Sequence, residues 1–109
     1  MNIKILSIEP HQGQKLVKFE ASIGIGFGVW MGELPAQGES IDVEIDVDDD
    51  LKWGRNIIMT SENVSMIALK NNQFHFVAEV LSYEDDGCLS VRVGDGIILL
   101  DVEDALNDI

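Results

Sequence analysis

Alternating acids are the clearest candidate for metal chemistry in this sequence. Asp46, Asp48 and Asp50 are spaced like the first ligands of a calcium-binding EF-hand loop. Such a loop needs glycine at its sixth position and a bidentate glutamate at its twelfth, where this chain has Leu51 and Ile57. We therefore reject an EF-hand and predict no metal and no cofactor. A weak surface cation site in this acidic run is the one alternative left open.

Three alternating glycines, Gly24, Gly26 and Gly28, suggest a nucleotide-binding loop. The dinucleotide fingerprint Gly-x-Gly-x-x-Gly would need its last glycine at Val29 or Met31, and no Gly-Lys-Ser or Gly-Lys-Thr follows. Glycine at every second position of a strand permits strong coiling, a bulge or the close approach of another backbone. We interpret these glycines as part of a bent strand.

Groups suited to nucleophilic or acid–base catalysis are sparse. His11 falls in a predicted turn, His75 falls in a predicted strand, and Cys88 is the one cysteine. A single cysteine rules out an internal disulfide and a zinc site built from several cysteines. Catalytic sets such as Ser-His-Asp meet in space rather than in sequence, but nothing local indicates one here. We predict that the protein is not an enzyme.

The strongest candidate for function is a row of carboxylates. Over residues 40–48, aliphatic and acidic side chains alternate in the period of two that is typical of a strand. Same-face neighbours on a strand lie ~7 Å apart, so four carboxylates would form a line ~20 Å long. A cationic partner would relieve their mutual repulsion, which salt screens but does not abolish. The predicted partner-binding residues are Asp42, Glu44, Asp46, Asp48 and, as an interface anchor just after them, Trp53.

Structural explanations compete with each of these assignments. Charged side chains on the solvent face of a sheet also protect its edge from aggregation. High net charge also keeps a protein in solution. Trp53 has an equally good alternative, in which it folds back to cover one end of the fold.

The charge balance selects among classes of partner. Twenty acidic residues face seven lysines and arginines, a net charge of −13 over 109 residues. Such a field repels nucleic-acid phosphates and anionic membranes and attracts basic proteins. We therefore predict an acidic binding or inhibitor protein that docks a basic protein partner, such as an immunity protein or antitoxin masking a toxin. The alternative is a small OB-like barrel that binds a small ligand or single-stranded nucleic acid. A subunit of a larger assembly, or a homodimer through a sheet edge, is a third hypothesis.

The cell compartment is predicted from what the sequence lacks. Its first residues have no basic region followed by an apolar run and a small-residue cleavage site. No apolar run approaches the ~20 residues that span a bilayer. With a single cysteine, these features favour a cytoplasmic protein and no membrane partner.

The elements that must position these residues are mainly strands. Period-two alternation and turn residues predict strands over residues 3–9, 17–23, 24–31, 40–48, 57–60, 64–70, 74–81, 89–93 and 97–100. The strand over 74–81 is apolar on both faces and is expected at the centre of a sheet. At the C-terminus, helical spacing of apolar residues predicts a short helix with Asp101 as its N-cap: Val102, Ala105, Leu106 and Ile109.

No linker, repeat or low-complexity segment interrupts this pattern. We expect one β-rich domain over residues 1–109. The predicted fold is mainly β, a small single-domain antiparallel barrel or sandwich, with an OB-like arrangement as one form and a short C-terminal helix.

Overall fold

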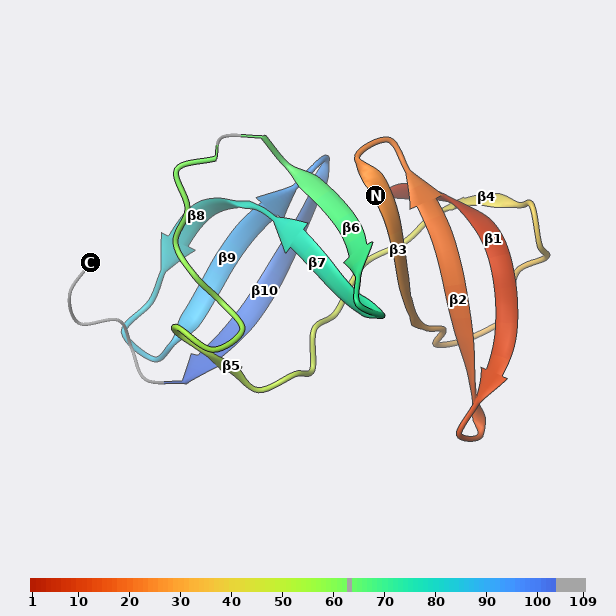
Figure 1. The fold of residues 1–109 in the computed structure, drawn as a ribbon, viewed down its shortest axis with the longest axis horizontal. Coiled ribbons are helices and arrows are strands. Elements are labelled where there is room, and N and C mark those ends of the chain that lie inside the picture. Colours follow the sequence, from red (N-terminus) through yellow and green to blue (C-terminus); the bar gives the residue numbers. More distant parts are fainter. Residues whose placement is uncertain (63, 104–109) are drawn as a thin grey trace. The chain divides into compact units, whose positions relative to one another are not determined.

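The computed structural model describes residues 1–62 and 64–103, and this part of the chain is mainly β (Figure 1). The described residues form ten strands in two sheets and contain no helix. The chain divides into two compact units. The first unit comprises residues 1–43 and 66–76, and the second comprises residues 44–65 and the described residues from 77 onward. That the chain is one domain stays a prediction.

A six-stranded sheet belongs to the first unit. Its spatial order is β4-β1-β2-β3-β6-β7. The strands are β1 (Asn2–His11), β2 (Gln14–Ala21), β3 (Gly24–Val29), β4 (Ser40–Asp42), β6 (Met66–Lys70) and β7 (Gln73–Val77). The first three strands form an antiparallel meander, whereas β6 runs parallel to β3. Asn71 and Asn72, between β6 and β7, adopt φ values of 54° and 61°, which are the positive values that a two-residue hairpin turn requires.

The core of the first unit follows the predicted alternation. Apolar residues of β1 and β2 are buried while their neighbours in sequence are exposed. The buried set is Ile3, Ile5, Val17, Phe19 and Ile67. The ring of Phe74 lies 6.0 Å from that of Phe19 and 5.8 Å from that of Phe76, centroid to centroid. Tilted and edge-on contacts of this kind add to the burial of the rings themselves.

The glycines of β3 allow the close approaches that their spacing predicts. Gly24 has φ +141°, and a Cβ there would overlap the backbone carbonyl oxygen of Ile67. The Ile67 amide donates a hydrogen bond to the Ile23 carbonyl at 3.1 Å, so the backbones of β3 and β6 meet here. At Gly26, a Cβ would lie 2.5 Å from the Phe74 ring. The predicted strand is confirmed, with close contacts at Gly24 and Gly26, whereas its bend stays a prediction.

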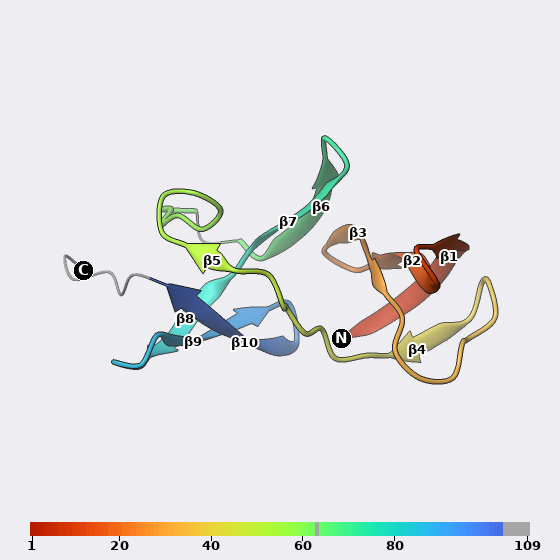
Figure 2. The same ribbon diagram turned by 90° about the horizontal axis from the view of Figure 1, so that it is seen from below.

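A four-stranded sheet belongs to the second unit (Figures 1 and 2). Its order is β5-β10-β9-β8, and the strands are β5 (Leu51–Lys52), β8 (Glu79–Tyr83), β9 (Cys88–Val93) and β10 (Gly96–Glu103). Strands β8, β9 and β10 pair antiparallel, and β5 pairs parallel with β10. One face carries the buried set Leu51, Leu89, Val91, Val93, Ile98, Leu100 and Val102.

The barrel form of the predicted fold, with its OB-like arrangement, is wrong because neither sheet closes, and purely antiparallel pairing is wrong as well. The sandwich form stays a prediction. Each sheet contains a parallel pair, because each takes in a strand from a distant part of the chain: β6 beside β3, and β5 beside β10. Each sheet is open and ends in two edge strands, β4 and β7 in the first, β5 and β8 in the second. A homodimer could form through one of these edge strands, and it stays a prediction.

The predicted strand over residues 40–48 is confirmed only over β4. Its partner β1 begins at Asn2, so the ladder has almost no further residue to pair with. The last bonds join Met1 and Val43, with the Val43 amide donating to the Met1 carbonyl at 2.9 Å. Residues 43–48 are outside any ladder (Figure 2), yet their aliphatic side chains are half-buried and their acids exposed in strict alternation.

Two further predicted strands differ from the structure, because the partner that each segment pairs with decides where a strand begins and ends. The predicted central strand over residues 74–81 is interrupted at Ala78 and contributes β7 and β8, which are edge strands of different sheets. The predicted strand over 57–60 is reduced to a single bridge between Trp53 and Ile57.

The predicted helix is wrong at its start. Residues 101–103 belong to β10, where Val102 pairs with Leu51, so Asp101 is no N-cap. The remainder of that predicted helix lies outside the described residues.

A candidate acidic docking surface

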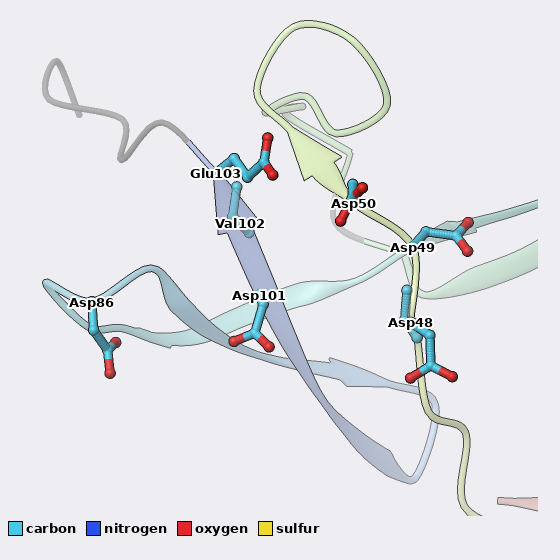
Figure 3. Close-up of a pocket in the computed structure, with 8 residues that line it drawn as sticks. Asp48, Asp49, Asp50, Asp86, Asp101, Val102 and Glu103 are labelled. Atoms are coloured by element: carbon cyan, nitrogen blue, oxygen red, sulfur yellow. The ribbon is translucent and has the colours of Figure 1, made fainter.

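An open hollow of about 370 Å³ in the second unit is lined mainly by carboxylates (Figure 3). It is formed by the segment before β5, the turn before β9 and the C-terminal half of β10. We call this site the acidic hollow. It is lined by Val47 and Val102 and by six acids: Asp48, Asp49, Asp50, Asp86, Asp101 and Glu103.

Strand pairing explains why acids from three segments meet. The parallel register of β5 and β10 sets Leu51 beside Val102, so the acids that precede these residues, Asp50 and Asp101, lie at neighbouring positions. The antiparallel register of β9 and β10 pairs Asp101 with Cys88, directly after the turn that carries Asp86. The pairing of Leu51 with Val102 therefore also fixes the positions of Asp50 and Asp101, which precede them in sequence.

The turn over residues 84–87 is held against β10 by backbone hydrogen bonds. The Val102 amide donates to the Gly87 carbonyl at 3.0 Å, and the Gly87 amide donates to the Glu84 carbonyl at 3.0 Å. The Asp86 carboxylate accepts from the Cys88 amide at 3.0 Å, which orients Asp86 locally. A Cβ on Gly87 would lie 2.6 Å from the Val102 carbonyl oxygen.

Gly87 is therefore predicted to be required for this turn. Gly87→Ala places a methyl group against the Val102 carbonyl at a φ of +91° and should lower the free energy of unfolding by about 2 kcal/mol. Gly32→Ala is a matched control, because Gly32 has φ +92° with nothing within 4 Å of a Cβ. It should cost only about 1 kcal/mol, for the backbone conformation alone. Urea denaturation of the two variants measures the difference, and equal losses would contradict the steric argument.

The acidic hollow is not neutralised by the described part of the chain. None of its six carboxylates forms an ion pair with a residue that the structure describes. The guanidinium of Arg55 donates instead to the backbone carbonyl of Asp50 at 2.8 Å, and the Asn56 amide donates to the same carbonyl at 2.9 Å. The ion pair of Arg92 with Glu79, at 3.7 Å, involves no acid of the hollow.

A metal site is not supported by the geometry. Among the described residues, no three or more His, Cys, Asp or Glu side chains are grouped closely enough to hold a metal ion. Asp49 points away from β10 in Figure 3, although Asp48 and Asp50 flank it in sequence. The surface cation site considered for this run therefore gains no support.

The structure separates the residues predicted to bind a partner. Asp42 lies on β4 in the first unit, where its carboxylate accepts a hydrogen bond from the Asn2 side chain at 3.2 Å. Glu44 and Asp46 are exposed in the segment before β5 and do not line the hollow. Asp48 is the member of the predicted row that joins the other acids of the hollow.

Trp53 packs against a neighbouring ring. Its ring centroid lies 6.2 Å from that of Tyr83 in an edge-on arrangement. Its indole N–H points to the Tyr83 hydroxyl at 3.5 Å, and the side chain is half-buried. Trp53 thus packs against Tyr83 of the same unit, as in the alternative in which it folds back onto the fold. Its role as an interface anchor stays a prediction.

The predicted partner-binding set missed five of the six acids of the hollow. Asp49 and Asp50 were considered only as part of a weak cation site, and Asp86, Asp101 and Glu103 were not considered as contacts. One signal was present: period-two alternation continues through the end of β10, with Asp101 and Glu103 on either side of the apolar Val102. The helical spacing of residues beyond Val102 competed with that signal. Asp86 carried no signal of its own, because acids are common in turns.

The fold and the site together define a mainly β chain with an acidic surface hollow. Comparison with protein-family models, with curated proteins and with solved structures found no match. No helix long and apolar enough to cross a membrane occurs among residues 1–62 and 64–103.

Proposed function

We propose that this chain is an acidic binding protein that docks a basic protein partner through the acidic hollow, as an immunity protein or antitoxin would mask a basic toxin. The observation that carries the proposal is that three segments line one open hollow with six acids, none of which forms an ion pair with a described residue. Lysine and arginine side chains of a partner would supply the missing counter-charges. The free thiol of Cys88 suits the reducing cytoplasm, where we place the encounter.

The physical advantage of such a surface is speed and selectivity of association. Like charges concentrated in a concave site create a field that attracts cationic surfaces and repels anionic ones. Complementary charge can raise association rate constants by one to three orders of magnitude at low ionic strength. Glu44 and Asp46 are exposed in the same unit and would add to the attraction, and the predicted role of Asp42 in the first unit is kept as part of the proposal.

The test compares two triple variants with equal net charge. Asp48→Asn/Asp50→Asn/Asp101→Asn neutralises three of the six acids of the hollow, whereas Glu9→Gln/Glu20→Gln/Glu33→Gln neutralises three exposed acids of the first unit. Each full-length protein is immobilised and exposed to an extract of the source organism at low and at high salt. The wild type and the first-unit variant should retain the same basic protein at low salt and release it at high salt.

The hollow variant is expected to bind that protein with an association rate constant about tenfold lower at low salt. Surface plasmon resonance with the purified partner measures the rate. Equal losses in both variants would show that net charge, not the hollow, drives binding. Failure of the wild type to retain any basic protein at low salt would refute the proposed function.

A further inference from the structure

One face of β10 places aliphatic and acidic side chains in a single row. Ile98, Leu100 and Val102 point into the core, so the residues between them point the other way. Ile97 and Leu99 are 60% and 65% exposed and are neighbours on the same face, so together they form an exposed apolar patch. The row continues along the strand with Asp101 and Glu103, both acids of the hollow.

The neighbouring strand leaves the aliphatic part of this face open. Arg92 of β9 lies opposite Ile97, and its guanidinium pairs with Glu79 of β8 at 3.7 Å. Ser90 lies opposite Leu99 and is too short to cover it. The Arg92–Glu79 ion pair therefore lies beside Ile97. Along β10, the two aliphatic side chains are followed on the same face by Asp101 and Glu103 of the acidic hollow.

From this juxtaposition we infer that the β10 face is the apolar half of the docking surface, and that its occupant is a segment of a basic protein with aliphatic side chains next to lysine or arginine. Charge complementarity selects this occupant, because Asp101 and Glu103 continue the aliphatic row. A second copy of this chain is disfavoured, since it would bring another net charge of −13 to the same surface. The inference rests on the proposed function and adds the chemistry of the partner.

The two halves of the surface should differ in their response to salt. Attraction between the hollow and cations is screened as ionic strength rises. Burial of Ile97 and Leu99 against aliphatic side chains is not screened, so it should retain the partner after the encounter. A partner that carries positive charge but no aliphatic side chains would contact only the acidic hollow.

Two synthetic peptides of equal charge test this inference on the full chain. The amphipathic probe is Leu-Ser-Leu-Ser-Lys-Ser-Lys, whose spacing matches the row on β10, and the polar probe is Ser-Ser-Ser-Ser-Lys-Ser-Lys. Methyl-group NMR titration gives both dissociation constants. The amphipathic probe should bind about tenfold more tightly, from burial of its two leucines, and it should shift the methyl signals of Ile97 and Leu99.

A pair of double variants locates the effect. Ile97→Ser/Leu99→Ser should abolish the advantage of the amphipathic probe, whereas Ile58→Ser/Met59→Ser should keep it. The control removes apolar side chains of the same unit that are 72% and 55% exposed but belong to no strand. Thermal denaturation checks that both variants stay folded.

The outcomes separate this inference from the proposed function. If the wild type shows no preference for the amphipathic probe, or the Ile97/Leu99 variant keeps the preference, the inference is overturned. The proposed function survives that result if both probes bind the wild type in a salt-dependent way and bind the Asp48/Asp50/Asp101 variant more weakly. If the polar probe does not bind the wild type even at low salt, the acidic hollow fails as a cation-docking surface.

Discussion

Gly24→Ala is expected to lower the free energy of unfolding by about 3–4 kcal/mol, combining a strained backbone with a steric overlap. The new Cβ would overlap the carbonyl oxygen of Ile67, at the point where β6 joins β3, and Gly24 has φ +141°. Relief would require β6 to move away from β3. The loss is large against the 5–15 kcal/mol that is typical of whole domains. Urea denaturation followed by circular dichroism measures it.

Gly28→Ala is the matched control for this prediction. Gly28 lies on the same strand at the same alternation, and nothing lies within 4 Å of its Cβ position. Because alanine loses less conformational entropy than glycine on folding, this change should be neutral or stabilise by about 0.5 kcal/mol. If Gly24→Ala is tolerated as well as Gly28→Ala, the close approach of β3 and β6 is not a requirement of the fold.

Ile98→Ala is expected to cost about 2–5 kcal/mol, from lost burial and the cavity left behind. Ile98 is 3% exposed and lies in the core of the second unit. The adjacent Ile97 is 60% exposed, so Ile97→Ala should change stability by less than about 0.5 kcal/mol. Denaturation midpoints of the two variants provide the comparison, and similar losses would show that the two faces of β10 are not as different as their exposures indicate.

The same substitution tests the prediction of one domain, because each unit contains one tryptophan. Trp30 lies in the first unit, where its indole donates to the Glu33 carbonyl at 2.8 Å, and Trp53 lies in the second. Replacing either residue by phenylalanine leaves a single fluorescent reporter. In a chain that unfolds cooperatively, Ile98→Ala shifts the transitions seen by both reporters equally. A shift confined to the Trp53 reporter would show that the units unfold separately and that the one-domain prediction is wrong.

The like charges of the acidic hollow also lower the stability of the free protein. Six carboxylates without ion pairs to described residues repel one another in the free protein, and added salt or a cationic partner reduces that repulsion. The buried apolar residues of β9 and β10 hold the hollow together against it. A binding site of this kind is stabilised by its own partner, as expected for any ligand that binds only the folded state.

Local patterns in the sequence were sufficient to predict most strands and turns. Alternation of apolar and polar residues decides which side chains a strand buries, and it correctly indicated β1, β2, β9 and half of β10. The glycines of β3 and the turn at Asn71 and Asn72 are also local, because they report backbone conformations that few residues adopt. The exposure of the acids over residues 42–48 followed from the same alternation.

The tertiary structure alone decided which segments become neighbours. Alternation cannot specify a partner, so it did not show that β4 ends where β1 begins, or that Ala78 divides one apolar run between two sheets. Alternation also did not show that Asp86, Asp101 and Asp48 line one hollow, because this depends on the registers of β5, β9 and β10. Registers are set by long-range pairing of buried side chains, which is a property of the assembled sheet rather than of any segment.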